Sequence, residues 1–239
     1  QFGEMVEAFR AGLAGVGVAR GDKVAVIADN SVEWAVIAHS CYGLGAAMVP
    51  MYEAQHEKDW EFIVRDCEAR VLFVANKAIL EKTKRFLKDI GTLRTIVCLE
   101  DVSGQGSSVN SYGELMKAGK AGKPVPATQP KRDDVATLIY TSGTTGNPKG
   151  VVLSHYNIAS NATAIHEIFP MDKDDRSLSF LPWAHVFGQT AELHILFSYG
   201  ASMALCEGTN KILDNLAEVK PTILMSVPRI FNKIYQSVQ

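Results

Sequence analysis

The residues best suited to chemistry gather in one short segment, residues 140–150, which reads Tyr-Thr-Ser-Gly-Thr-Thr-Gly-Asn-Pro-Lys-Gly. Glycines lack a Cβ atom, so they let the backbone turn sharply and bring N–H groups close to a bulky anion. The hydroxyl and amide side chains add neutral donors, and Lys149 adds a mobile positive charge. This set of groups predicts a loop that binds a polyphosphate.

A Walker-type phosphate loop is a poor fit to this segment. The Walker pattern is G-x-x-x-x-G-K-[ST]. Counted from Gly143, its second glycine falls on Pro148, and Gly150 follows Lys149 where the pattern needs Ser or Thr. The segment therefore disfavours an ordinary kinase or GTPase.

The elements that must position this loop alternate between helices and apolar strands. Residues 24–28 and 71–74 are continuously apolar, which is typical of strands that are covered on both faces, and residues 95–99, apolar after Thr95, are also strand-like. The alternation predicts an α/β fold with parallel or mixed sheets flanked by helices on both faces. The loop follows a strand, so we expect it at a carboxyl end, where open α/β sheets bind ligands. The other expected strands are residues 48–50, 135–140, 151–153, 178–181, 203–206 and 222–227, and the expected helices include residues 2–16, 31–44, 158–169, 186–199 and 212–219.

Local signals refine this picture at two places. Asn30 and Glu33 have the spacing of a capping box, which predicts the start of a helix. Residues 119–134 contain three prolines and several lysines, the composition of a linker. We therefore expect a first α/β portion over residues 1–118, this linker, and a second α/β portion over residues 135–239 that carries the phosphate loop and is incomplete at its C-terminal end.

Composition restricts the partners and the compartment. The chain has 239 residues, with 24 Lys and Arg against 26 Asp and Glu, and a pI near 6.3. Without a broad basic field, we expect no nucleic-acid partner. Four widely spaced cysteines and the absence of a signal-peptide pattern favour a cytoplasmic protein. The basic segment of residues 77–88 could contact an anionic membrane peripherally, but a solvated helix face is the preferred interpretation.

Residues 140–150 closely resemble the phosphate loop of the adenylate-forming (AMP-binding) superfamily, which includes acyl-CoA synthetases, peptide-synthetase adenylation domains and luciferases. Residues 30–34, 49–52 and 227–231 resemble the long-chain fatty acid–CoA ligase (acyl-CoA synthetase) branch in particular. The resemblance covers essentially the whole chain but only the first part of the family pattern. It implies an N-terminal fragment, after which the family's Tyr-Gly-x-Thr-Glu segment, ribose-binding acidic residue and C-terminal lysine would follow.

The resemblance also implies roles for individual residues. Residues 181–189 resemble the family's acyl-pocket segment, where a histidine or aromatic residue approaches the substrate carboxylate. The expected catalytic residues are Lys149 and His185, and the expected magnesium ligand is Thr145. The expected contacts to the ATP phosphates are Thr141, Ser142, Gly143, Thr144, Thr145, Gly146 and Lys149. The expected substrate contacts are Trp183, His185, Phe187, Gly188 and Gln189, of which Trp183, Phe187 and Gln189 fit a buried core equally well.

The reaction that the resemblance implies has two halves. A fatty carboxylate attacks the α-phosphate of ATP, giving an acyl adenylate and pyrophosphate, and the thiol of coenzyme A then displaces AMP. Two alternatives stay open: a ligase that loads a carrier protein instead of coenzyme A, and a non-catalytic module that binds a nucleotide or an acyl group. We expect the fragment itself to be inactive and to self-associate through exposed apolar surface.

Overall fold

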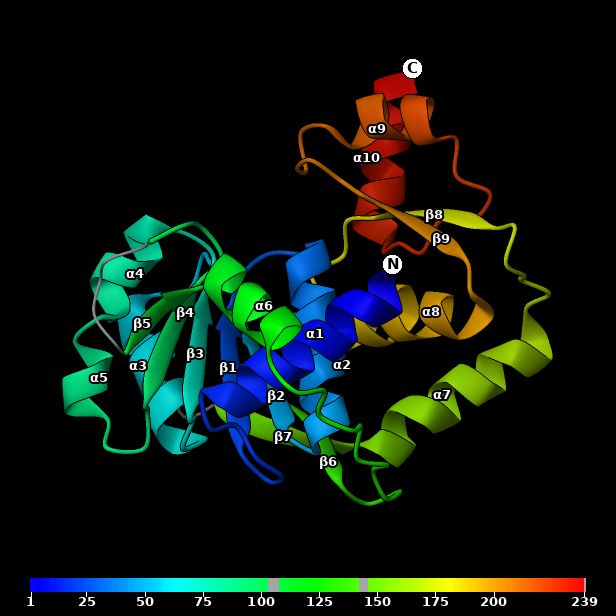
Figure 1. Cartoon of the computed structure of the whole chain (residues 1–239). Helices are drawn as coiled ribbons and strands as arrows, with labels where there is room; N and C mark the ends of the chain where they lie inside the picture. The colour runs from blue at the N-terminus through cyan, green and yellow to red at the C-terminus, as the bar shows by residue number, and fades with distance from the viewer. Residues whose placement is uncertain (103–107, 142–145, 239) are drawn as a thin grey trace. The chain divides into compact units, whose positions relative to one another are not determined.

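The structure is a computed structural model that describes residues 1–102, 108–141 and 146–238. The chain forms two compact units, Gln1–Asn157 and Ile158–Gln239, and Figure 1 identifies their helices and strands. Each unit is described by itself. Residues 119–134, the expected linker, lie within the first unit.

The first unit is built on a seven-stranded sheet with the strand order β5-β4-β3-β1-β2-β6-β7. The neighbouring strands are parallel except for β7, which runs antiparallel to β6 at the sheet edge. The continuously apolar runs occupy the central strands because these strands are covered on both faces. The strands are β1 (Lys23–Ile27), β2 (Ala47–Met51), β3 (Val71–Val74), β4 (Thr95–Cys98), β5 (Val109–Ser111), β6 (Val135–Thr141) and β7 (Lys149–Ser154).

Helices cover both faces of this sheet. On one face, Ile27 of β1 belongs to a buried cluster with Trp60, Ile79 and Phe86. On the other face, the ring of Phe9 lies 5.9 Å from the ring of Phe73, measured between centroids. The helices are α1 (Phe2–Gly15), α2 (Val32–Leu44), α3 (Glu57–Asp66), α4 (Lys77–Thr83), α5 (Phe86–Asp89) and α6 (Tyr112–Ala121). The predicted α/β fold, with a mostly parallel sheet between two helical layers, is confirmed.

The predicted capping box at the start of α2 is wrong by one residue. The cap is Ser31, whose Oγ accepts a hydrogen bond from the Trp34 amide at 3.0 Å. Because Trp34 stands at the third helical position, the reciprocal acidic partner of a capping box is missing there. A complete capping box occurs instead at α6, between Ser111 and Glu114.

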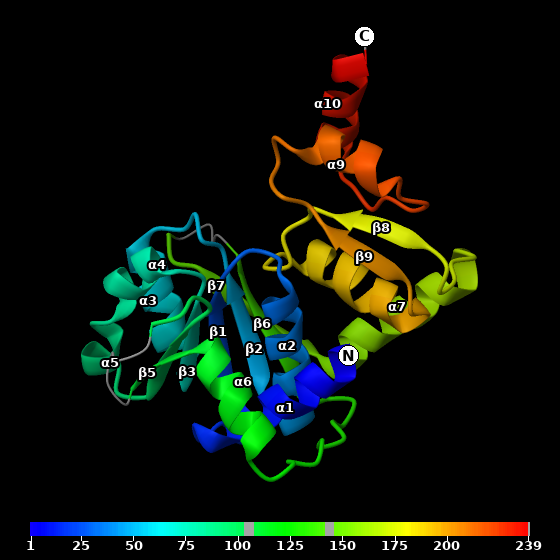
Figure 2. The same cartoon turned by 45° about the horizontal axis from the view of Figure 1, so that its top comes forward.

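The second unit contains a two-stranded parallel sheet, β8-β9, and most of α7. Figure 2 shows β8 and β9 side by side, with Ser177 opposite Met203 and Ser179 opposite Leu205. Its elements are α7 (His155–Ile168), β8 (Arg176–Ser179), the π-helix η1 (Gly188–Ile195), α8 (Leu196–Tyr199), β9 (Ser202–Leu205), α9 (Ile212–Val219) and α10 (Pro228–Val238).

Two expectations for the second unit need correction. The expected strand over residues 222–227 makes only an isolated bridge, between Ile223 and Ser177, because an apolar run forms a strand only where a partner strand continues the ladder. The expected helix over residues 186–199 is a π-helix over most of its length. Apolar periodicity alone does not distinguish these two kinds of helix. None of the helices in the described parts of the chain has the length and apolar character needed to span a membrane.

Candidate functional site

The expected phosphate loop connects the two strands of the β6–β7 hairpin. Thr141, the last residue of β6, pairs with Lys149, the first residue of β7. The expected contacts Ser142, Gly143, Thr144 and Thr145 lie outside the described residues. The described part of the loop therefore consists of Thr141 and residues 146–149, held at both ends by the hairpin.

The loop end of this hairpin is anchored to the rest of the first unit by Tyr140, which directly precedes Thr141. Its hydroxyl donates a hydrogen bond to the Asp66 carboxylate at 2.6 Å. Burial and this hydrogen bond both raise the pKa of Tyr140 above its ordinary value, so the phenol stays protonated and keeps donating. A Cβ atom at Gly150 would lie 3.0 Å from the Tyr140 ring, so the two residues are in close contact across the hairpin.

Two described loop residues have the properties that phosphate binding requires. Gly146 has a φ of +98°, a conformation that a residue with a side chain rarely adopts. Lys149 is exposed, and none of the described carboxylates forms an ion pair with it. A sharp glycine turn beside an available ammonium group is suited to an anionic ligand.

The expected acyl-pocket segment forms a tight corner between β8 and η1. The His185 amide donates to the Pro182 carbonyl at 3.0 Å, and the Gln189 amide donates to the His185 carbonyl at 2.9 Å. The His185 side chain is exposed, and its Nδ1 accepts a hydrogen bond from the Phe187 amide at 3.2 Å. A Cβ atom at Gly188 would lie 2.3 Å from the Pro182 carbonyl oxygen, so this corner requires a glycine.

The remaining expected substrate residues differ in exposure. Trp183 is buried, and its Nε1 donates a hydrogen bond to Ser179 Oγ at 3.1 Å. Gln189 is fully buried, and neither polar atom of its side-chain amide has a hydrogen-bond partner among the residues that the structure describes. Phe187 is exposed. These positions make Phe187 the best placed of the three to contact a ligand.

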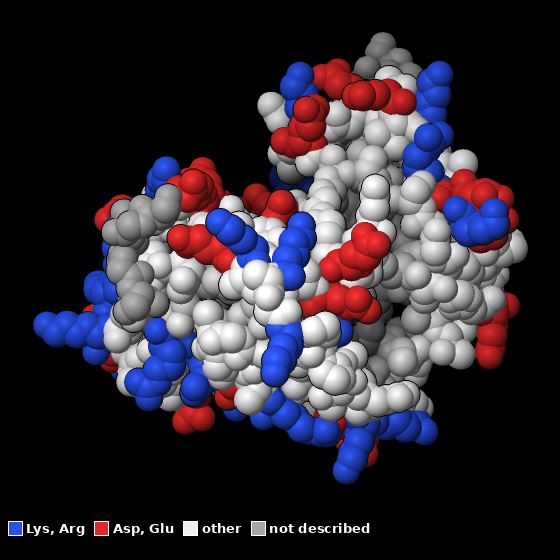
Figure 3. Space-filling view, in the orientation of Figure 1, with Lys and Arg blue, Asp and Glu red and all other residues white. Residues whose placement is uncertain are grey.

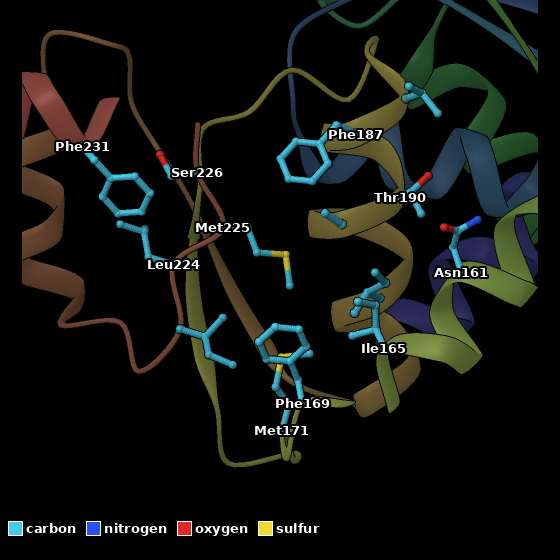
Figure 4. Close-up of a pocket in the computed structure, with 14 residues that line it drawn as sticks. Asn161, Ile165, Phe169, Met171, Phe187, Thr190, Leu224, Met225, Ser226 and Phe231 are labelled. Carbon is cyan, nitrogen blue, oxygen red and sulfur yellow. The ribbon is translucent and has the colours of Figure 1, made fainter. Parts of the chain in front are cut away.

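An apolar cavity of about 620 Å³ lies in the second unit, between α7, η1, residues 223–226 and α10. Its volume is within the usual range for small-molecule sites, about 300–1,000 Å³. Figure 4 shows Met225 extending into the cavity between Phe187 and Phe169. The lining residues are Asn161, Ile165, Phe169, Met171, Val186, Phe187, Thr190, Ala191, Ile195, Ile223, Leu224, Met225, Ser226 and Phe231. Only Asn161, Thr190 and Ser226 of this lining are polar, so the cavity suits an apolar ligand.

Most of this lining was not predictable from the sequence. Phe187 is the one expected substrate residue that lines the cavity. Ile165 of α7 and Phe169, which directly follows α7, have a helical apolar spacing that is typical of a core face. In the structure α7 has no buried residue, and Phe169 is 54% exposed. An apolar helix face that remains exposed is a signal for a ligand or partner, but only the structure reveals the exposure.

A buried carboxyl group, which the sequence interpretation did not include, lies behind the cavity wall. Glu192 of η1 is fully buried, and this burial raises its pKa to about 7. Its Oε1 accepts hydrogen bonds from the amides of Phe180 at 3.3 Å and Leu181 at 3.1 Å. Its Oε2 accepts a hydrogen bond from Ser179 Oγ. These hydrogen bonds lower the pKa but do not outweigh the burial.

Charges on the first unit are mixed in sign. On the face visible in Figure 3, Lys and Arg are interspersed with Asp and Glu. Within the basic segment of residues 77–88, Lys84 pairs with Glu81 at 2.5 Å, and Arg85 pairs with Glu61 at 2.6 Å and with Glu57 at 2.9 Å. Acidic partners therefore offset part of the positive charge on which a membrane contact would depend.

The sequence-based prediction of a magnesium ligand concerned the loop between β6 and β7. Thr145, the expected magnesium ligand, lies outside the described residues. The residues that the structure does describe include no group of three or more His, Cys, Asp or Glu side chains placed to hold a metal ion. We therefore derive no chemical step through a metal.

Comparison with known proteins agrees with the fold and with the loop. The sequence model of one family, described as AMP-binding enzyme, matches residues 1–239. The chain therefore belongs to the AMP-binding enzyme family, and the resemblance inferred from residues 140–150 is confirmed.

Several of the similar proteins are CoA ligases by name. The chain is 32% identical over 97% of its length to long chain acyl-CoA synthetase 6, peroxisomal, of Arabidopsis thaliana, and covers 34% of that protein. It is 31% identical over 98% of its length to the long-chain-fatty-acid–CoA ligase FadD15 of Mycobacterium bovis, and covers 39% of that protein. The crystal structure of the anthranilate CoA ligase AuaEII with anthranoyl-AMP matches 97% of the chain with a TM-score of 0.85 and 26% identity, and the match covers 45% of that structure. The chain thus spans about a third of the length of the curated relatives that it matches.

Proposed function

We propose that the complete protein to which this chain belongs activates a long-chain fatty acid with ATP and transfers the acyl group to coenzyme A. The observation that carries this proposal is the apolar cavity of the second unit, in a chain of the AMP-binding enzyme family. Two curated relatives, each covered over about a third of its length, act on long-chain fatty acids by name. The same cavity in an unrelated family would indicate only an apolar ligand.

The cavity supports an alkyl chain as the part of the substrate that it holds. Burial of each methylene group is worth about 0.8 kcal/mol, so a long chain supplies most of its own binding energy once it enters an apolar site. Ile165, Phe169 and Met225 present apolar side chains along the cavity. Asn161, Thr190 and Ser226 supply too few polar groups for a sugar or a peptide, which would need its own hydrogen bonds satisfied.

The β6–β7 hairpin supports a role in holding the nucleotide. In the first half-reaction, a carboxylate oxygen bonds to the α-phosphorus of ATP while the bond from that phosphorus to the pyrophosphate oxygen breaks. Negative charge accumulates on the departing pyrophosphate, and fixed donors and cations that surround it lower the barrier. Thr141 and Lys149 are exposed at the two ends of the loop, and we assign them, with residues 142–146, to the β- and γ-phosphates. The acyl adenylate bound in the similar ligase AuaEII is consistent with this chemistry.

His185 is assigned to the carboxylate end of the fatty acid. Its exposed ring stands two residues before Phe187, which lines the cavity. An imidazole donor there would orient the carboxylate toward the α-phosphate, and orientation of this kind accounts for much of the rate of a group transfer. In the second half-reaction, the sulfur of coenzyme A bonds to the acyl carbon and AMP leaves with the bonding electron pair. We assign none of the described residues to coenzyme A or to magnesium.

Exchange of labelled pyrophosphate into ATP tests the proposal in the full-length protein. We expect exchange that depends on a long-chain fatty acid, and loss of most of this exchange in Lys149→Ala, because the charge that stabilises pyrophosphate is removed. Lys117→Ala, on the exposed surface of α6, is the matched control and should exchange normally. Absence of exchange with every fatty acid would reject the proposal.

Adding coenzyme A or a carrier protein to the same protein then identifies the acyl acceptor. Transfer only to a carrier protein would reject coenzyme A as the acceptor in the second half-reaction.

A further inference from the structure

We infer that Glu192 is a positioning residue that fixes the η1 wall of the apolar cavity against the end of β8. This inference rests on the proposed function, because it treats the cavity as the acyl site. Glu192 does not line the cavity, so it would act through the residues that do. Its role follows from what its carboxyl group joins.

The carboxyl group connects two segments that are separate in the sequence. Glu192 is in η1, whereas its hydrogen-bond donors Ser179, Phe180 and Leu181 are the last residue of β8 and the two residues after it. The Ser179 hydroxyl in turn accepts a hydrogen bond from Trp183 at 3.1 Å. One buried side chain therefore accepts hydrogen bonds from two backbone amides and a hydroxyl of the neighbouring segment.

The same helix presents its other side to the cavity. Thr190 and Ala191, which directly precede Glu192, line the cavity, as does Ile195. Successive residues of a helix point in different directions. The residues that line the cavity and the Glu192 carboxyl group therefore lie on different sides of the same rigid helix. When Glu192 holds η1 at one place against β8, it also places Thr190 and Ala191. The π-helical geometry of η1 fits this role, because such turns are rare and often occur at functional sites.

The corner between the two segments transmits the same constraint to Phe187 and His185. The corner begins at Leu181, which Glu192 holds, and its backbone turns back at Pro182 to meet Gly188. His185 and Gln189 continue this set of backbone hydrogen bonds into η1. Loss of the carboxyl group would therefore release both the corner and the helix start that carries Phe187.

The test compares fatty-acid binding with local backbone exchange in the full-length protein. Glu192→Gln keeps the size of the side chain but replaces one acceptor oxygen with an NH₂ group that faces donors. We expect its affinity for cis-parinaric acid, a fluorescent long-chain fatty acid, to fall about tenfold or more, the effect of losing one hydrogen bond to a charged group. Amide hydrogen exchange of residues 186–191 should become faster. Ser179→Ala removes one of the three donors and should produce a smaller change in the same direction, which keeps the test usable if Glu192→Gln does not fold.

Asn215→Leu is the matched control for a purely structural effect. Asn215 is also buried in the second unit, where its side chain accepts a hydrogen bond from the Glu207 amide at 3.0 Å and donates to the Glu207 carboxylate at 2.9 Å, and it does not line the cavity. Its substitution should reduce stability yet leave parinaric acid binding and the exchange of residues 186–191 unchanged. The inference is overturned if Glu192→Gln and Ser179→Ala bind and exchange like the wild type, or if Asn215→Leu has the same effects as they do.

The outcomes also separate this inference from the proposed function. If the wild-type full-length protein does not bind parinaric acid, the assignment of the cavity to fatty acids fails. The exchange measurement needs no ligand, so faster exchange of residues 186–191 in Glu192→Gln would still support the mechanical link between Glu192 and the wall. Normal exchange would reject that link whatever the ligand.

Discussion

The buried carboxyl group of Glu192 makes the stability of the second unit depend on pH in a direction that can be worked out. Burial raises the pKa of Glu192 from 4.5 to about 7. Below pH 4.5 the group is protonated in both the folded and the unfolded chain and adds no penalty. As the pH rises toward 7, the unfolded chain releases its proton more readily than the folded chain, so the free energy of unfolding decreases. Above pH 7 both states are ionised and the penalty is constant, at about 3 kcal/mol.

The perturbation that isolates this effect is Glu192→Gln. A glutamine does not ionise, so the pH-dependent penalty disappears even though the substitution disrupts hydrogen bonds at every pH. Between pH 5 and pH 8, the unfolding free energy of the wild type should therefore fall by about 2.5 kcal/mol relative to that of Glu192→Gln. This slope, and not the absolute stability, is the prediction.

Urea denaturation at several pH values measures the slope. In a Trp34→Phe, Trp60→Phe background, Trp183 is the one tryptophan of this chain, and its fluorescence reports on the second unit. The control is Leu193→Ala in the same helix. Leu193 is fully buried, so its truncation should cost about 2–5 kcal/mol by leaving a cavity, and it removes no ionisable group. Its curve should run parallel to that of the wild type. If the curve of Glu192→Gln is also parallel to that of the wild type, the reasoning about the buried carboxyl group is refuted.

Three further predictions concern the first unit, and each is measured as a change in unfolding free energy. Ser31→Ala should lose about 1 kcal/mol because the Trp34 amide loses its cap, whereas Asn30→Ala should lose less. A larger loss in Asn30→Ala than in Ser31→Ala would contradict Ser31 as the cap and support the predicted capping box of Asn30 and Glu33. Gly146→Ala should cost about 1–2 kcal/mol because its φ of +98° is unfavourable for alanine, and an unchanged stability would show that the turn adopts another conformation. Tyr140→Phe should cost about 1 kcal/mol through the lost hydrogen bond to Asp66, an effect that should vanish in an Asp66→Ala background, which has no side-chain acceptor.

Much of the fold could be predicted because its signals are local. The apolar runs at β1, β3 and β4 are continuous, since a parallel strand that is covered on both faces has no solvent side on which to place polar residues. The strands on either side of the expected phosphate loop were predicted for a similar reason, from the apolar segments 135–140 and 151–153, but their antiparallel pairing in a hairpin was not predicted.

Features that depend on a partner could not be predicted from the sequence. Residues 222–227 have the composition of a strand, but only Ile223 bridges to β8, and the rest lack a ladder partner among the described residues. The cap of α2 was misplaced because Asn30 and Ser31 are both good caps, and the choice between them depends on backbone geometry.

The candidate site was predicted less completely than the fold. Sequence reasoning found residues whose chemistry is visible in their type, such as Lys149 and the glycines beside it. It found Phe187 but not Ile165 or Met225, because an apolar residue in a cavity and one in a core have the same composition and spacing. Glu192 was missed because a single glutamate in a helix is usually exposed, and nothing in its neighbours in the sequence indicates burial.

The central claim is that the apolar cavity of the second unit holds the acyl chain of a fatty acid. A fatty acid with a photoreactive diazirine near its methyl end tests this claim directly, because irradiation of its complex with the full-length protein attaches it to whatever the chain end contacts. We predict that peptide mapping will locate the label on α7 or on residues 223–226, with competition by unlabelled fatty acid. Labelling confined to other parts of the protein, under the same competition, would contradict the claim.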